Sequence, residues 1–116
     1  MIETYELPQG KIMIVYCNEN VSIGLLELNS NQEIPKHLRP ISEELSQIYG
    51  VSVIKILDGD TIIREDIINE GQGLKVPANQ VHIHSNPTND KSIALWKFDG
   101  NIIEVIEGIR KNFRRI

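Results

Sequence analysis

All three histidines of the chain fall into two short polar clusters, which hold the residues best suited to chemistry. His37 belongs to the first cluster, with Arg39 and Glu43 close behind it, and the second cluster contains His82 and His84. Imidazole and carboxylate groups together are common ligands of iron, manganese, nickel and zinc. Because no histidine lies elsewhere, the sequence favours one site for a single divalent transition metal, Fe, Mn, Ni or Zn.

Strand periodicity predicts which of these side chains share a face. Residues two positions apart on a strand point to the same side, so His82 and His84 are predicted to share a face. His37 and Arg39 do the same if their segment is extended, and the proline after Arg39 favours that conformation. Glu43 follows a short turn and could face the same space from the adjoining strand.

Three further residues near Glu43 are candidates for contacting a ligand, together with Arg39. Gln47 and Tyr49 lie an even number of residues after Glu43, so on a strand they point to the same side as Glu43. They would either line the interior of the barrel or fill its core. Glu44 has the opposite parity, and it turns inward only if the register slips by one residue. Solvent exposure is the simpler expectation for Glu44.

Short strands must position both clusters. Runs of β-branched and large apolar residues bounded by turn residues predict strands at 12–17, 21–28, 51–57, 61–68, 81–84 and 92–98. Asp58-Gly59 predicts a hairpin turn. For 45–49 we predict a strand and not a helix that starts at Ser42, because Gly50 ends the segment early. This many short strands with regular turns indicate an all-β sandwich or barrel.

The last segment has a different period. Its apolar residues recur at steps of three and four, which predicts a helix over about 102–114, at Ile102, Ile106, Ile109, Phe113 and Ile116. Acidic residues come early and basic residues late, as the helix dipole favours. A strand over 102–106 is the competing interpretation.

Length and composition bound the class of protein. The chain of 116 residues is expected to form one domain, 1–116, with 41% hydrophobic and 24% charged residues. A net charge of −4 gives no reason to expect binding to nucleic acid or to an anionic membrane. The single cysteine, Cys17, and the lack of a signal peptide at the start point to the cytoplasm.

The spacing within the two clusters resembles the two motifs of the cupin family, over about 31–50 and 71–86. The matching residues are His37, Glu43 and Gly50 in the first motif and Gly71, Pro77, His82 and Asn86 in the second. Asn31 and Asn79 stand where those motifs usually have glycine, and asparagine readily adopts positive φ.

The resemblance implies a double-stranded β-helix, or jelly-roll barrel, that is often a homodimer. It also implies one metal ion held by three histidines and one glutamate. His37, Glu43 and His82 match three of those ligand positions. Arg39 stands at the fourth and departs from the pattern, because a guanidinium has no lone pair to give a metal.

Three interpretations of Arg39 follow. In the first, His84 replaces the missing imidazole. In the second, two histidines and Glu43 form an open triad, and Arg39 holds an anionic substrate beside it. In the third, the metal is lost and Arg39 pairs with Glu43 or Glu44 inside a binding pocket.

The function hypotheses therefore stay broad, since one fold hosts many functions. The first hypothesis is a small metal-binding cupin that binds or transforms a small polar or anionic metabolite. If it is an enzyme, the family suggests isomerase, epimerase, decarboxylase or dioxygenase chemistry. The alternative is a metal-free, non-catalytic protein that binds a small ligand or serves as a dimerising scaffold.

Overall fold

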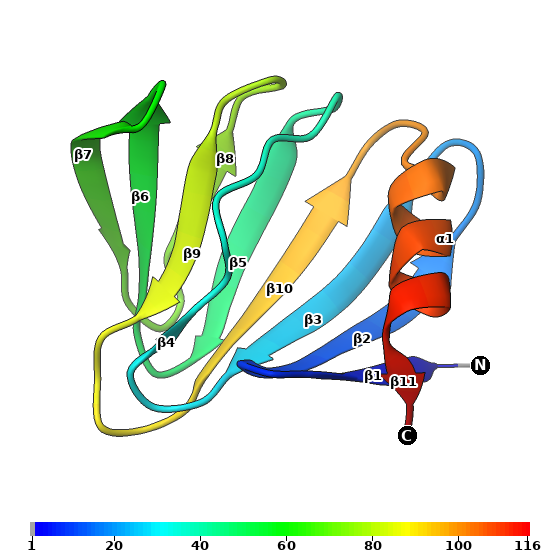
Figure 1. Cartoon of the computed structure of the whole chain (residues 1–116), viewed down its shortest axis with the longest axis horizontal. Helices are drawn as coiled ribbons and strands as arrows, with labels where there is room; N and C mark the ends of the chain where they lie inside the picture. The colour runs from blue at the N-terminus through cyan, green and yellow to red at the C-terminus, as the bar shows by residue number, and fades with distance from the viewer. Residues whose placement is uncertain (1) are drawn as a thin grey trace.

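The computed structural model describes residues 2–116, which form two antiparallel sheets and a helix near the C-terminus (Figure 1). The elements are β1 Glu3–Leu7, β2 Gly10–Cys17, β3 Ser22–Leu28, β4 Gln32–Glu33, β5 Glu43–Tyr49, β6 Ser52–Asp58, β7 Thr61–Ile68, β8 Gly73–Val76, β9 His82–Asn86, β10 Ser92–Phe98, α1 Ile103–Asn112 and β11 Arg114–Arg115. The predicted all-β barrel with a C-terminal helix is confirmed. No helix within residues 2–116 is long and apolar enough to span a membrane.

Strands distant in sequence become neighbours in both sheets. The larger sheet has the order β11-β1-β2-β3-β10-β5-β8, and the smaller has the order β4-β9-β6-β7. β5 begins with Glu43 of the first polar cluster, and β9 contains His82 and His84 of the second. The two strands lie in different sheets. A site made from both clusters must therefore lie between the sheets.

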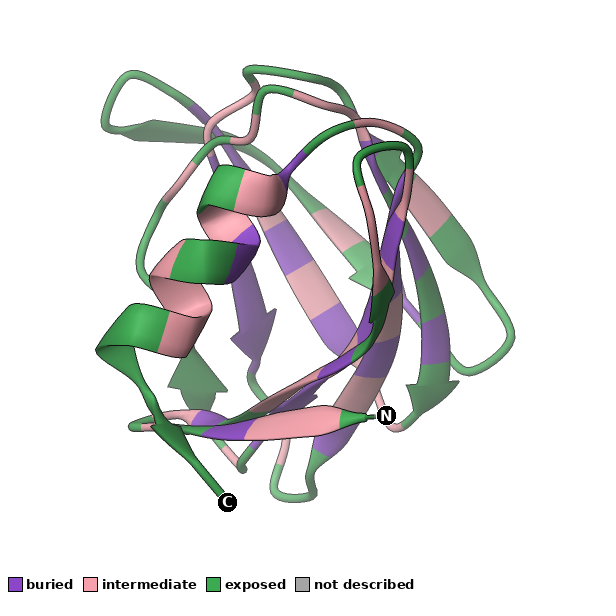
Figure 2. Cartoon of the chain, turned by 90° about the vertical axis from the view of Figure 1, so that its right-hand side faces the viewer, coloured by how far each residue is buried: buried purple, intermediate pink, exposed green. Residues whose placement is uncertain are grey.

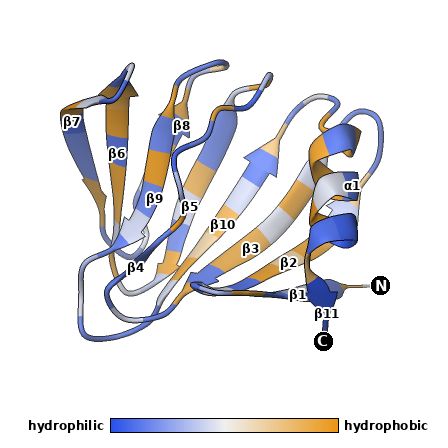
Figure 3. Cartoon of the chain, viewed as in Figure 1, coloured by the Kyte–Doolittle hydropathy of each residue, from blue (hydrophilic) through white to orange (hydrophobic). Residues whose placement is uncertain are grey.

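One face of each strand turns inward, because residues two apart point to the same side. On β9 the inward residues His82 and His84 are polar and the isoleucine between them is apolar, which Figure 3 shows as alternating bands of hydropathy. On β10, every second residue is buried, including Trp96 and Phe98. Gly24 of β3 lies under the Trp96 ring, and a Cβ at Gly24 would come within 2.1 Å of it. A glycine is therefore required at this close approach.

The predicted helix forms, and the competing strand over 102–106 is wrong. α1 lies alongside the barrel, and its Ile106 is fully buried (Figure 2). The helix is fastened to β1, because Arg110 donates to both carboxylate oxygens of Glu3 at 2.9 and 2.7 Å. β11 then pairs with β1 and extends the larger sheet. The sequence did not predict β1, β4, β8 or β11, since each is short and weakly patterned.

The turns follow the expected residue chemistry. Asn31 and Asn79 have φ of 58° and 63°, as expected where asparagine replaces a motif glycine. Gly59 has φ of 61° in the turn between β6 and β7, which confirms the predicted hairpin. β5 is a strand from its first residue, so the helical alternative at Ser42 is wrong.

Candidate metal centre

Three segments supply the side chains of the site. β9 carries His82 and His84, whose side chains are buried on one face of the strand. Glu43 is the first residue of β5, and it is buried as well. His37 precedes β5 and lies beside His82, because the two residues exchange backbone hydrogen bonds of 3.0 and 2.9 Å.

The four side chains converge on a single point. One potential ligand atom from each of His37, Glu43, His82 and His84 lies within 4.8 Å of the others. Glu43 Oε1 is 3.3 Å from both His82 Nε2 and His84 Nε2. Ligand atoms bound to one ion at about 2.1 Å are separated by about 3 to 4 Å. The spacing of the group is therefore compatible with one metal ion.

Backbone carbonyls hold two of the imidazole rings in place. His37 Nδ1 is 3.0 Å from Pro35 O, and His82 Nδ1 is 2.7 Å from Gln80 O. A carbonyl oxygen only accepts, so each Nδ1 carries the hydrogen. In the neutral ring, Nε2 is then left with a free lone pair, which is the arrangement that metal-binding histidines use.

The contact between His82 and Glu43 calls for a positive charge. If His82 is neutral, Nε2 presents a lone pair to a carboxylate oxygen 3.3 Å away, and that oxygen also only accepts. Two acceptors repel each other at this distance unless a cation lies between them. A proton on His82 or a metal ion satisfies both groups.

Burial and neighbouring charges set the protonation states of the group. Burial lowers the pKa of His37 to about 3, and His84 and Arg39 act in the same direction. His37 is therefore neutral above that pH, as a metal ligand must be. Burial alone would raise the pKa of Glu43, but the imidazoles of His84 and His82 outweigh it and hold this pKa below its ordinary value. Glu43 is thus ionised at neutral pH.

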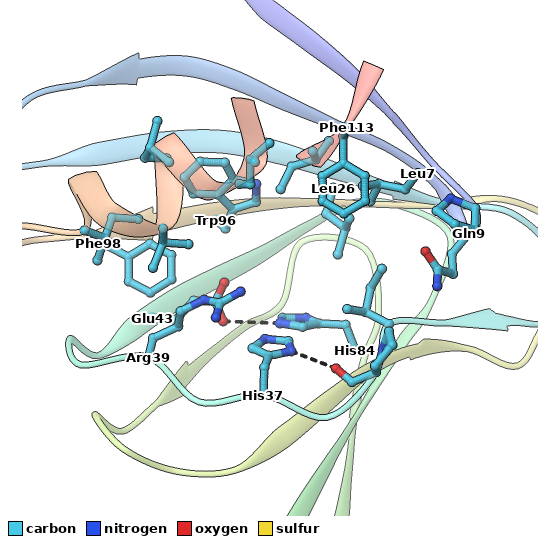
Figure 4. Close-up of a pocket in the computed structure, with 18 residues that line it drawn as sticks. Leu7, Gln9, Leu26, His37, Arg39, Glu43, His84, Trp96, Phe98 and Phe113 are labelled. Atoms are coloured by element: carbon cyan, nitrogen blue, oxygen red, sulfur yellow. Dashed lines mark hydrogen bonds and ion pairs between the residues drawn. The ribbon is translucent and has the colours of Figure 1, made fainter. Parts of the chain in front are cut away.

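A cavity of about 380 Å³ adjoins the group (Figure 4). One wall is polar and carries His37, Arg39, Glu43 and His84. Apolar residues form most of the remaining lining, from β1 to β3, from the segment after β4, from β10 and from α1: Leu7, Pro8, Ile12, Leu26, Ile34, Pro35, Trp96, Phe98, Ile102, Val105, Ile106, Ile109 and Phe113. Gln9 also lines the cavity, at the end distant from Arg39.

Arg39 lines the cavity beside the histidines. Its Nη1 donates to Leu38 O at 3.3 Å, and it forms no ion pair within residues 2–116. Burial lowers the pKa of Arg39, whereas the charge of Glu43 acts to raise it. The ion pair that the third interpretation expects with Glu43 or Glu44 is therefore not formed, and most of the guanidinium donors stay available.

The structure does not bring Glu44, Gln47 or Tyr49 to this cavity. Glu44 is exposed on the outer face of β5, opposite Lys97 and Lys75 on the neighbouring strands. Gln47 is buried, but its Nε2 donates to Ser92 Oγ at 2.9 Å and so ties β5 to β10.

A β-bulge accounts for the position of Tyr49. Ile93 pairs with Tyr49 and Ala94 pairs with Gln47, so one extra residue of β5 lies between them. A bulge reverses the parity that follows it. Tyr49 is therefore exposed, and its hydroxyl donates to Asp90 Oδ2 at 2.7 Å.

Most of the apolar wall was missed by reasoning from the sequence. Ile109 and Phe113 were predicted to share one helical face, but Val105 was not assigned to it, and no cavity was expected there. The periodicity of that helix was the available indication, since it identified which face turns inward. Nothing in the sequence showed that the cluster containing His37 would lie across from it.

Comparisons with known proteins support the fold. No protein-family model matches the chain, and no curated protein sequence matches it significantly. Among solved structures, a variant of Bacillus subtilis oxalate decarboxylase matches with a TM-score of 0.74 at 19% identity, over 84% of this chain and 27% of that one. BH2720 from Bacillus halodurans matches with a TM-score of 0.70 at 12% identity, over 75% of this chain and 67% of that one.

A structure of oxalate oxidase also matches, with a TM-score of 0.63 at 17% identity, over 70% of this chain and 42% of that one. The chain thus spans about a quarter of the length of oxalate decarboxylase and less than half that of oxalate oxidase. These neighbours belong to the cupin superfamily, so the double-stranded β-helix that the motifs predicted is confirmed.

Proposed function

We propose that this protein with the cupin fold binds one divalent transition metal through His37, Glu43, His82 and His84. With Arg39 beside the metal, it would bind or transform a small anionic molecule. The observation that carries the proposal is the contact of Glu43 Oε1 with His82 Nε2 at 3.3 Å. Because His82 Nδ1 already donates to Gln80 O, two acceptors meet there unless a cation lies between them. Of the three interpretations of Arg39, this one combines the ligand set of the first with the anion contact of the second.

Charge balance supports an anionic ligand. A divalent ion next to the ionised Glu43 leaves one positive charge, and the unpaired Arg39 adds another. A carboxylate balances one of these charges and a phosphate dianion balances both, and either accepts paired hydrogen bonds from a guanidinium. The metal, when bound, would supply Lewis-acid polarisation of a ligand oxygen. Arg39 would orient that ligand, and Trp96 and Phe98 would keep water from it.

Two of the structural neighbours support a small carboxylate. They are enzymes named for oxalate, and one structure is of oxalate oxidase in complex with glycolate. A further structure of the decarboxylase is described by its Mn(II) centres. Three imidazoles and one carboxylate suit Fe, Mn, Ni or Zn, so the identity of the metal is left to measurement.

Elemental analysis of the protein, purified without a histidine tag, tests the proposal. We expect about one Fe, Mn, Ni or Zn per chain, lost in His82→Ala and strongly reduced in His84→Ala. If His84→Ala keeps full affinity for the metal, the three-residue triad of the second interpretation replaces the four-residue site.

A protein that neither contains metal nor takes it up would refute both versions. A proton, not a metal ion, would then lie between Glu43 and His82. The alternative function, a metal-free small-ligand-binding or scaffold protein, would replace the proposal.

Several expectations about partners stay predictions. They are a homodimer, which light scattering would detect, the absence of nucleic-acid binding and a location in the cytoplasm. The exposed isoleucines of the edge strand β7, Ile62, Ile63 and Ile67, are compatible with a contact between two copies.

A further inference from the structure

We propose that the ligand is a monocarboxylate with an apolar body. Its carboxylate would lie at Arg39 and the metal centre, and its hydrocarbon part would lie under α1. The position of the carboxylate rests on the proposed function, whereas the apolar body rests on the cavity wall alone.

Polarity is separated across the cavity. Thirteen of the eighteen lining residues are apolar. The charged and imidazole groups lie together on one wall, and Trp96, Leu26 and Phe113 face them from the other (Figure 4). A small dianion such as oxalate would satisfy the polar wall but leave the apolar wall in contact with water. A ligand that is charged at one end only matches both walls.

The apolar wall is not sealed by the protein's own core. Leu7, Ile12, Ile34, Val105 and Ile109 are only partly buried, although each packs against the core. Partly exposed apolar side chains around a cavity lose water contact when an apolar ligand enters. Each methylene buried in this way is worth roughly a fourfold gain in affinity.

The size of the cavity limits the ligand. A volume of about 380 Å³ lies near the lower end of the range for small-molecule sites. It suits a short aliphatic or single-ring acid.

Isothermal titration of the full chain, loaded with Zn²⁺ and checked by elemental analysis, tests the proposal. The probes are acetate, butyrate, hexanoate, phenylacetate and oxalate. We expect affinity to rise roughly fourfold per methylene from acetate to hexanoate. Hexanoate and phenylacetate should both bind more tightly than oxalate.

Two variants separate the charged end of the ligand from its apolar end. Val105→Phe fills the apolar part, so hexanoate should lose at least about tenfold in affinity while acetate and the metal content stay unchanged. Val15→Phe, the same change at an exposed position of β2, is the control. Arg39→Gln should weaken every carboxylate by the same factor, and Arg64→Gln, in an exposed ion pair on β7, should not.

The outcomes distinguish this inference from the proposed function. Affinity that does not change with chain length, or oxalate as the tightest ligand, would overturn the apolar-body proposal even if the metal is bound. Rising affinity with chain length in a protein that takes up no metal would support it while refuting the metal site.

Discussion

Single side chains decide the character of the centre, and Glu43 is the most informative of them. It is buried, ionised and in contact with two imidazoles, so its charge is matched inside the protein and not by water. An isolated buried carboxylate is costly, which makes a nearby positive charge part of the design of the site. The adjacent residue, Glu44, has the same chemistry but points to solvent.

This difference gives a matched pair of variants. Glu43→Gln removes the only carboxylate of the group, so metal affinity should fall by more than the roughly 10- to 100-fold that loss of an outer-shell partner costs. Glu44→Gln should leave metal affinity unchanged. Competition with a chromophoric chelator measures both affinities. Equal losses in the two variants would show that overall charge, not coordination, controls binding.

Among the elements, α1 both encloses the cavity and depends on β1. Arg110 forms an ion pair with Glu3 at 2.7 Å, and a second pair, of Arg114 with Glu6, continues to β11 at 2.8 Å. The first pair is partly buried, whereas the second is largely exposed. Partly shielded charged hydrogen bonds contribute more than surface pairs do.

The pH dependence of stability should report the first pair. The Arg110 guanidinium, with help from Tyr5, lowers the pKa of Glu3 to about 2. A carboxyl with a depressed pKa adds stability above its ordinary pKa, and that stability is lost as pH falls through the folded value. Glu3→Gln should therefore lower the free energy of unfolding by about 1–3 kcal/mol at pH 7. The difference should shrink as pH falls from about 4.5 toward 2.

Glu6→Gln serves as the control for that measurement, because its pair is exposed; we expect a loss below about 0.5 kcal/mol. Urea unfolding at several pH values measures both variants. A Glu3→Gln effect that is the same at pH 7 and near pH 2 would contradict the role assigned to the pair.

Across the whole molecule, the candidate metal centre takes its residues from both sheets. Glu43 belongs to the larger sheet and His82 and His84 belong to the smaller one. An ion held by both would cross-link the barrel at its interior. Binding to the folded state alone must then stabilise the entire domain.

Thermal unfolding with and without metal tests this linkage. At a free metal concentration 100 times the Kd, we expect a gain of about 2.7 kcal/mol. That gain raises the Tm by on the order of 10 °C for a domain of this size. His82→Ala should show no difference between metal and chelator. A wild-type Tm that is the same in both conditions, with metal demonstrably bound, would place the ion outside the folded core.

Local patterns in the sequence were enough for much of this structure. The two-residue period of strands placed His82 and His84 on one face, and helical periodicity predicted α1, because both periods depend only on neighbouring residues. The preference of asparagine for positive φ accounted for Asn31 and Asn79. The two motifs then identified the fold and three of the four converging side chains, and strand parity added His84.

Tertiary structure alone decided the rest. A bulge in β5 turns Tyr49 out of the barrel, and no local sequence pattern predicted that bulge. Arg39 lacks an ion pair and faces an apolar wall from α1. This arrangement brings together segments about 70 residues apart in the sequence. The two-residue period of a strand predicts the direction in which a side chain points. The residues that lie opposite that side chain are determined only when the barrel closes. The sequence by itself therefore identified the residues that could bind a metal. The packing of α1 against the barrel determined the shape and polarity of the cavity beside them, and so the kind of ligand that we propose.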